Sequence, residues 1–239
     1  MRLLELTLPT PEENLALDEA LLDENDTSGG PQETLRLWES DRPLVVIGRS
    51  SRIAEEVRRG LCEELRIPVL RRSSGGAAIV AGPGCLMYAL VLSYSLRPSL
   101  RAIDVAHRFV LETIAAALRR LVPGVESRGT SDLAIGGRKF SGNSVRCTPD
   151  RMLYHGTLLY DFPLELIARL LAMPSRQPDY REGRGHELFV TNLSLTSSAI
   201  REAMITAWQA TDPCSDWPQS ATARLAVERY ARREWNAQL

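Results

Sequence analysis

Apolar residues recur along the chain with two spacings, one typical of helices and one typical of strands. Leucines at helical spacing predict an amphipathic helix over 11–25, with Thr10 as its N-terminal cap and Pro11 in its first turn. A longer apolar stripe predicts a helix over 99–121. Further helices are predicted over 51–65 (interrupted or ended near Gly60), 163–171, 196–210 and 221–237.

The runs between these helices are rich in β-branched and apolar residues, and they predict strands. The Gly136-Gly137 pair predicts a tight hairpin, which the strand at 151–162 extends to a meander. The predicted elements follow the order helix, strands with hairpins, then helices. This order indicates an α+β fold with mixed, largely antiparallel sheets flanked by helices. We expect a single domain over 1–239. The predicted strands are 34–40, 44–50, 68–74, 86–95, 133–135, 138–142 and 151–162.

Composition and charge exclude several classes of protein. The chain has 29 basic and 30 acidic residues, which argues against nucleic-acid binding through bulk charge. No apolar run reaches the roughly 20 residues of a membrane span, and the first residues lack an apolar signal core. Four dispersed cysteines form no CxxC pair, so neither a disulfide framework nor a zinc site is expected. We therefore expect a soluble cytoplasmic protein.

Lys139 is the only lysine among the 29 basic residues. Its survival in an arginine-rich chain has two explanations, chance or a need for a compact ammonium in place of a planar guanidinium. It follows the Gly136-Gly137 hairpin and precedes Ser141-Gly142-Asn143, which is predicted to form a turn. These surroundings favour a functional lysine.

A second glycine-rich stretch runs Arg71-Arg72-Ser73-Ser74-Gly75-Gly76-Ala77-Ala78. Small residues after a strand let the backbone approach a ligand, and adjacent arginines suit phosphate or carboxylate. It is neither a Walker loop nor a GxGxxG motif, and in isolation such a stretch is usually only a turn. We predict that Lys139 projects into the same cavity as this loop, where both would suit a carboxylate being activated as an acyl phosphate or adenylate.

Two stretches, RRSSGGAAIVAGPGCLMYAL and SDLAIGGRKFSGNSVR…YHGTLLYDF, resemble the signature blocks of the lipoate-protein ligase A family. Three further stretches are similar as well: NLALDEALL, LWE…VVIGR and, at the close of the catalytic domain, PDYREGRGHELFVTNL. The resemblance therefore covers nearly the whole chain. It implies a mixed-sheet α+β fold shared with biotin protein ligases and octanoyltransferases. It also implies a two-step reaction: lipoate (or octanoate) and ATP, with Mg²⁺, give an acyl-adenylate, and the acyl group then passes to a lysine of a lipoyl domain. The implied acceptor is of the glycine cleavage H protein or 2-oxoacid dehydrogenase E2 type.

The resemblance also assigns residues. Lys139 would contact the carboxylate and the α-phosphate, Asp132 would help place Mg²⁺ or the nucleotide, and Asn143 would hold its loop. The dithiolane tail would need an apolar tunnel near the strand at 86–92. The remaining candidate binding residues implied by the two blocks are Arg72, Ser74, Gly75, Gly76, Ala77, Ala78, Gly137, Ser141, Gly142, His155 and Gly156.

The chain departs from the family pattern in three respects. Ala77 replaces the third glycine of the first block, and Ala81 replaces a histidine. The chain also ends near the close of the catalytic domain, so we expect no C-terminal accessory domain. It would then work alone, need a separate accessory subunit, or perform only the transfer step. Gly82-Pro83-Gly84 resembles part of the HGPG sequence that follows the glycines in the octanoyltransferase branch of the family.

Two other functions stay open on the sequence. One is an ATP-independent transferase that moves octanoyl or lipoyl groups between carrier proteins through a thioester on Cys85 or Cys147, although cysteine is more often a buried apolar residue. The other is a module that binds lipoyl-adenylate without transferring it. His155 is either a gating or acceptor-side residue or a hydrogen-bonded structural histidine. Arg181 and Arg184, in the irregular segment 174–187, either contact a phosphate or acceptor acid or belong to a solvated loop.

Overall fold

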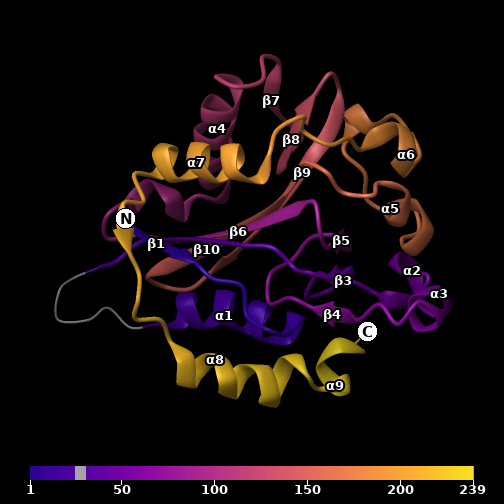
Figure 1. Ribbon diagram of the computed structural model, residues 1–239, viewed down its shortest axis with the longest axis horizontal. Coiled ribbons are helices and arrows are strands. Elements are labelled where there is room, and N and C mark those ends of the chain that lie inside the picture. Colours follow the sequence, from indigo (N-terminus) through magenta and orange to yellow (C-terminus); the bar gives the residue numbers. More distant parts are fainter. Residues whose placement is uncertain (25–30, 239) are drawn as a thin grey trace.

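A mixed sheet of eight strands forms the frame of the fold (Figure 1). The computed structural model describes residues 1–24 and 31–238. β1 runs parallel to both of its neighbours and the other pairs are antiparallel, which confirms the predicted fold class. In spatial order the strands are β11 (Asp212–Pro213), β1 (Arg2–Glu5), β2 (Thr34–Trp38), β6 (Cys85–Ser93), β10 (Arg151–Leu159), β9 (Arg138–Cys147), β8 (Asp132–Ile135) and β7 (Val125–Arg128).

A smaller sheet of three strands lies beside the large one. Its order is β4 (Val69–Arg71), β3 (Leu44–Ile47) and β5 (Ile79–Ala81). The segments 34–40 and 44–50 are both strands, as predicted, but they belong to different sheets. The sequence did not predict β5, which lies inside the glycine-rich stretch and pairs antiparallel with β3.

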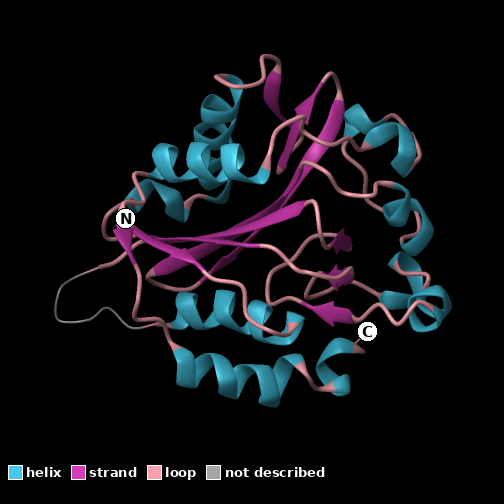
Figure 2. Ribbon diagram, viewed as in Figure 1, coloured by secondary structure: helices cyan, strands magenta, loops and turns pink. Residues whose placement is uncertain are grey.

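Helices cover both faces of the large sheet (Figures 1 and 2). The helices α4 (Ile103–Arg119) and α7 (Ser197–Trp208) lie on one face, and α1 (Pro11–Asp23) and α8 (Gln219–Leu225) lie on the other. All nine residues of β6 and of β10 are therefore buried. Because neighbouring side chains alternate, Tyr154 packs in the core beneath α4 while His155 faces α1.

The predicted helices form, with corrections at their ends. Thr10 caps α1 and makes a reciprocal capping box with Glu13. The helix predicted over 51–65 breaks at Val57 and not at Gly60, because Val57 forms a β-bridge to Leu171. The helix predicted over 221–237 is three short pieces. The other helical elements are α2 (Ile53–Glu56), α3 (Arg59–Glu64), η1 (Pro98–Arg101), α5 (Glu165–Leu170), η2 (Asp179–Arg181), α6 (His186–Phe189), η3 (Ala226–Tyr230) and α9 (Arg233–Asn236).

The predicted hairpin at Gly136-Gly137 is confirmed, with φ angles of 55° and 70° that favour glycine. The turn predicted at Ser141-Gly142-Asn143 is wrong, because β9 runs straight through these residues to pair with β10. The register between β8 and β9 shifts at Leu133 and Ala134. This bulge adds one residue to β9 between Lys139 and Ser141.

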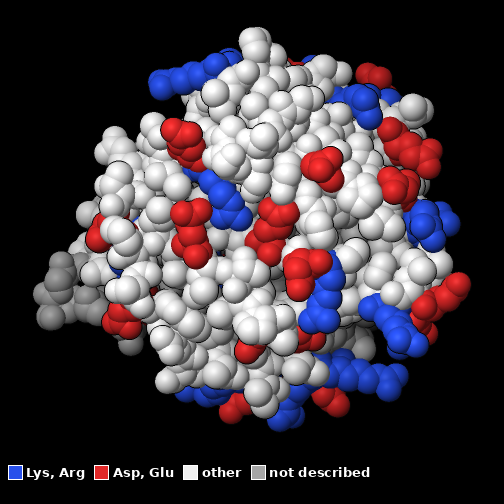
Figure 3. Space-filling model, viewed as in Figure 1, with Lys and Arg blue, Asp and Glu red and all other residues white. Residues whose placement is uncertain are grey.

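The surface shown in Figure 3 carries basic and acidic side chains interspersed with each other, as the near-zero net charge suggests. Among the described residues, no helix is both long enough and apolar enough to cross a membrane.

Candidate functional site

Lys139 lies beside a buried carboxylate. Its Nζ is 2.6 Å from Oδ1 of Asp132, and the lysine side chain is 28% exposed against 8% for the aspartate. The hydroxyl of Tyr180 donates to the other oxygen, Oδ2, over 2.8 Å. Lys139, Asp132 and Tyr180 thus form a chain of polar contacts.

Two glycines in the strands make room for this arrangement. A Cβ atom on Gly142 would lie 2.8 Å from Nζ of Lys139, so the lysine folds back over a position without a side chain. A Cβ atom on Gly156 would lie 1.8 Å from Oδ1 of Asn143. The Asn143 amide instead donates to the carbonyl of Ser131 over 2.8 Å, and it therefore holds the loop that leads into Asp132.

The glycine-rich loop between β4 and β5 is braced from within by Arg72. Its guanidinium is buried, and burial lowers its pKa to about 10. Its bonds are 2.5 to 3.2 Å long, and their acceptors are the carbonyl oxygens of Val46, Gly75 and Ala77 and the Oγ of Ser74. Most of the Arg72 N–H groups are therefore used to hold the loop in place. The residue contributes positive charge to the cavity but few free hydrogen-bond donors.

Arg71 does not serve the site as the sequence suggested. It is fully buried and is not among the residues that line the cavities described below. Its guanidinium joins the loop at 48–51 to the C-terminal segment 235–238 through carbonyl oxygens alone. These acceptors are the carbonyls of Gly48, Arg49, Ser51, Trp235, Asn236 and Gln238.

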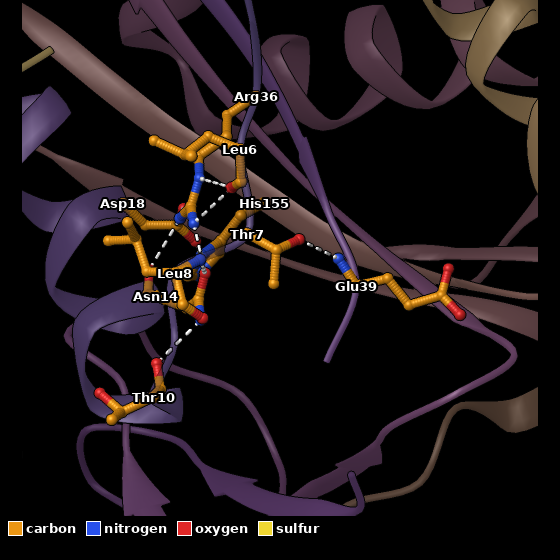
Figure 4. Close-up of polar contacts among 9 residues, drawn as sticks. All are labelled: Leu6, Thr7, Leu8, Thr10, Asn14, Asp18, Arg36, Glu39 and His155. Carbon is orange, nitrogen blue, oxygen red and sulfur yellow. Dashed lines mark hydrogen bonds and ion pairs between the residues drawn. The ribbon is translucent and has the colours of Figure 1, made fainter. Parts of the chain in front are cut away.

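His155 belongs to a buried polar network (Figure 4). Its Nε2 is 2.6 Å from Oγ of Ser74, and its Nδ1 is 3.4 Å from Oδ2 of Asp18. Asp18 in turn pairs with the fully buried Arg36 at 2.5 Å, and Arg36 also bonds to Asn14. Burial lowers the pKa of Arg36, an effect that Asp18 opposes. Both ring nitrogens of His155 therefore have protein partners, as expected for the structural histidine, although the ring also lines a cavity.

Two cavities meet at Lys139. The first, of about 370 Å³, is the more polar, and Leu15, Val46 and Met87 give it an apolar part. The second, of about 150 Å³, is mostly apolar, with Phe140 and Phe189 in its wall. Residues common to both are Ala77, Ala78, Ile79, Lys139, Gly142, Thr157, Arg176 and Pro178.

The structure brings most of the candidate residues to these cavities. It confirms that Lys139 shares a cavity with the glycine-rich loop. Ser74 and Gly75 do not line either cavity, because Ser74 is buried beyond His155, and Gly137 lies at the hairpin tip. The candidates that do line a cavity are Arg72, Gly76, Ala77, Ala78, Asp132, Lys139, Ser141, Gly142, Asn143, His155 and Gly156. Their roles toward a substrate stay predictions.

Glu56 is a cavity residue that the sequence did not indicate. Its Oε2 accepts a hydrogen bond from the backbone N–H of Ala78 over 2.6 Å. We expected the backbone N–H groups of this loop to bind a substrate anion. One of them, that of Ala78, instead donates to the Glu56 carboxylate. Glu56 reaches the loop from α2, far away in sequence, so no local motif identifies it. Asp18, by contrast, lies in NLALDEALL, one of the stretches that carry the family resemblance.

Arg181 and Arg184 contribute to the folding of segment 174–187. The Arg181 guanidinium lies 4.6 Å from the Phe189 ring and donates to the carbonyl of Arg184. Arg184 donates to the carbonyls of Gly137 and Tyr180. Arg181 is buried and also lines the second cavity, so it is not part of a solvated loop, and its contact with a phosphate or acceptor acid stays a prediction.

The four cysteines are not part of the two cavities. Cys85 is fully buried, and burial raises the pKa of its thiol, which disfavours the thiolate. Cys147 is exposed at the end of β9.

A magnesium ion would find one carboxylate beside Lys139, that of Asp132. Both of its oxygens already accept bonds from Lys139 and Tyr180. Among the described residues, no three His, Cys, Asp or Glu side chains gather as a metal site. These residues fit only an ion that takes most of its ligands from substrate phosphates and water, as Mg²⁺ commonly does.

Comparison with known proteins gives several sequence relatives that cover most of the chain. Lipoate-protein ligase LplJ of Bacillus subtilis is 25% identical over 95% of this chain and 70% of its own. Octanoyltransferase LipM of Carboxydothermus hydrogenoformans is 26% identical over 93% of both chains. The chain spans only 45% and 46% of the length of two further relatives named as lipoate-protein ligases.

Solved structures show the same fold. A bipartite lipoate protein ligase from Thermoplasma acidophilum, described with its E2 lipoyl domain, superposes with a TM-score of 0.83 at 22% identity, covering 99% of this chain and 95% of that one. A lipoate-protein ligase A bound with ATP has a TM-score of 0.79 at 23% identity, covering 99% and 98%. Residues 10–209, which include every candidate residue above, match the lipoyl protein ligase A/B catalytic domain. The chain therefore belongs to the lipoyl protein ligase A/B catalytic domain family, a family of enzymes.

Proposed function

We propose that the protein is an ATP-dependent lipoate-protein ligase, which activates lipoate (or octanoate) as an acyl-adenylate and transfers the acyl group to a lysine of a lipoyl domain. The observation that carries the proposal is the Asp132-paired ammonium of Lys139 at the meeting point of two cavities. The ligase names of its relatives support it, as does a neighbour that binds ATP.

Lys139 would act on charge in both steps. First, a carboxylate oxygen attacks the α-phosphorus of ATP, and pyrophosphate leaves. An ammonium between the two negatively charged groups offsets their repulsion and stabilises the charge of the transition state. Then the acceptor amine attacks the carbonyl carbon, the bond to AMP breaks, and the amine proton passes to solvent. The same ammonium would stabilise the departing phosphate.

The chemistry of the two cavities suggests how the substrates divide. The acyl chain suits the first cavity, where Leu15, Val46 and Met87 supply apolar surface. Met87 belongs to β6, within the stretch expected to line the tunnel. The nucleotide base suits the apolar second cavity. Mg²⁺, when bound through Asp132 and phosphate oxygens, would neutralise phosphate charge.

One assay tests the function. The purified chain is mixed with lipoate, Mg-ATP and a lipoyl domain of the H-protein or E2 type, and the domain is weighed by mass spectrometry while pyrophosphate is measured. A lipoylated domain together with released pyrophosphate is the expected result. Adenylate formation without a modified domain would instead support a separate accessory subunit or a binding module. An unmodified domain without pyrophosphate would refute the proposal.

The second candidate is an ATP-independent octanoyl or lipoyl transferase. The similarity to the octanoyltransferase LipM, over 93% of both chains, favours it. It predicts acceptor modification from an acyl carrier without ATP or pyrophosphate. A thioester mechanism would be lost in a Cys85→Ala, Cys147→Ala double variant, whereas the ligase would keep its activity. The absence of all four cysteines from the lining of both cavities favours the ligase.

A further inference from the structure

The segment 178–184 holds both sides of the hairpin that carries Lys139. On one side, the Tyr180 hydroxyl donates to Oδ2 of Asp132 over 2.8 Å. On the other, Arg184 donates to the carbonyls of Tyr180 and Gly137 over 2.6 and 3.0 Å. Asp132 pairs with Lys139, and Gly137 precedes it by two residues, so one short segment fixes both the side chain and the turn.

The ring of Tyr180 is held independently of its hydroxyl. Its centroid is 5.1 Å from that of Phe189, and the Arg128 guanidinium lies 5.9 Å from the ring. Gly129 also approaches closely, since a Cβ atom there would lie 3.5 Å from the ring. A phenylalanine would keep these ring contacts and lose only the hydrogen bond.

We propose that Tyr180 is a positioning residue, which fixes Asp132 and through it sets the place of the Lys139 ammonium between the two cavities. Asp132 is a buried residue, and its Oδ2 accepts a hydrogen bond from this hydroxyl. Without it, the carboxylate is free to rotate or to take water, and the ammonium bound to Oδ1 moves with it. The catalytic consequence rests on the proposed function, but the effect on the lysine does not.

The chain offers a matched control. Tyr160 is also half-buried and donates to a carboxylate, Oε1 of Glu39, over 2.7 Å. It lines neither cavity. Tyr180→Phe and Tyr160→Phe therefore remove the same kind of bond, and only the first is expected to disturb Lys139.

The first measurement does not need enzyme activity. Because Lys139 is the only lysine, protein grown with ¹³C,¹⁵N-lysine and carrying no lysine in any added tag has a single lysine side-chain signal set in its NMR spectrum. We expect the Cε and Nζ resonances to shift or broaden in Tyr180→Phe and to stay unchanged in Tyr160→Phe. Unchanged resonances in Tyr180→Phe would overturn the proposal, whether or not the protein is a ligase.

The second measurement is kinetic. In Tyr180→Phe, we expect kcat for adenylate formation to fall about tenfold while KM for lipoate and ATP changes less than about twofold, since misplacement affects the transition state more than binding. Adding Tyr180→Phe to Asp132→Ala should cause no further loss, because the tyrosine acts through that carboxylate. Full additivity, or an equal loss in Tyr160→Phe, would overturn the proposal. An inactive unmutated chain would instead refute the proposed function and leave the NMR result standing.

Discussion

Replacing Gly142 by alanine tests whether the position of the Lys139 ammonium limits the reaction. The new Cβ atom would lie 2.8 Å from Nζ and 2.9 Å from Cε, where ordinary contact begins at 3.4 Å. The ammonium must therefore move by roughly 0.6 Å, which disturbs its 2.6 Å pairing with Asp132. Because the displaced atoms are the end of a flexible side chain, the fold should lose no more than about 1 kcal/mol. A displacement of this size should lower kcat by about 10- to 100-fold.

The assay is pyrophosphate release at saturating lipoate and Mg-ATP, with urea unfolding to measure stability. Gly60→Ala is the matched control, because a Cβ atom on Gly60 has no neighbour within 4 Å. Gly60 lies in α3, so alanine there should leave kcat unchanged and add up to about 1 kcal/mol of stability.

A Gly142→Ala protein with unchanged kcat would refute the reasoning. It would show that the reaction tolerates a displaced ammonium, and the role given to Lys139 would have to be withdrawn. A large loss of stability would instead show that the strand and not the lysine gives way.

Three further variants test charged side chains, one that lines the second cavity and two that are fully buried. Glu56→Ala frees the N–H of Ala78 and removes a negative charge, so we expect calorimetry to give a several-fold lower Kd for Mg-ATP; weaker binding would contradict the assignment of that N–H to an anion. Arg36→Met leaves the Asp18 carboxylate buried without its partner, and urea unfolding should show a loss of about 3 kcal/mol; a loss below about 1 kcal/mol would contradict it. Burial alone would raise the pKa of Glu19. The hydrogen bonds from Arg146 and Tyr230 lower it by more than burial raises it, so the pKa in the folded protein lies below the usual 4.5. Its ionised form therefore stabilises the fold fully above pH 4.5 and loses this effect as the pH falls through the folded-state pKa. The stability difference between the unmutated chain and Glu19→Gln should be about 2 kcal/mol at pH 7 and shrink in acid; a difference independent of pH would contradict it.

Local signals in the sequence were sufficient for much of the fold. The Thr10 cap and the Gly136-Gly137 pair act through backbone geometry within a few residues, and both are confirmed. The break at Val57 and the strand β5 were missed because each depends on pairing with a distant segment. Neither the composition nor the periodicity of a segment indicates which distant segment it will pair with.

The candidate site also has features that the sequence indicated and features that only the fold determines. The unusual lysine and the glycine-rich loop were visible in the sequence, and the structure places them at one cavity. The roles of the two arginines were not visible in the sequence, because a guanidinium can donate to backbone carbonyls as well as to phosphates. Arg71 and Arg72 are largely satisfied by carbonyls that only the fold brings to them.

The sequence by itself therefore determined the α+β class, the hairpin that presents Lys139 and the family signature, since these depend on residues close together in the chain. Tertiary structure decided which groups surround the lysine. Glu56 and Tyr180 reach the site from separate elements, α2 and η2. Long-range packing sets their hydrogen bonds, because a buried polar group must take whichever partner the fold places within reach.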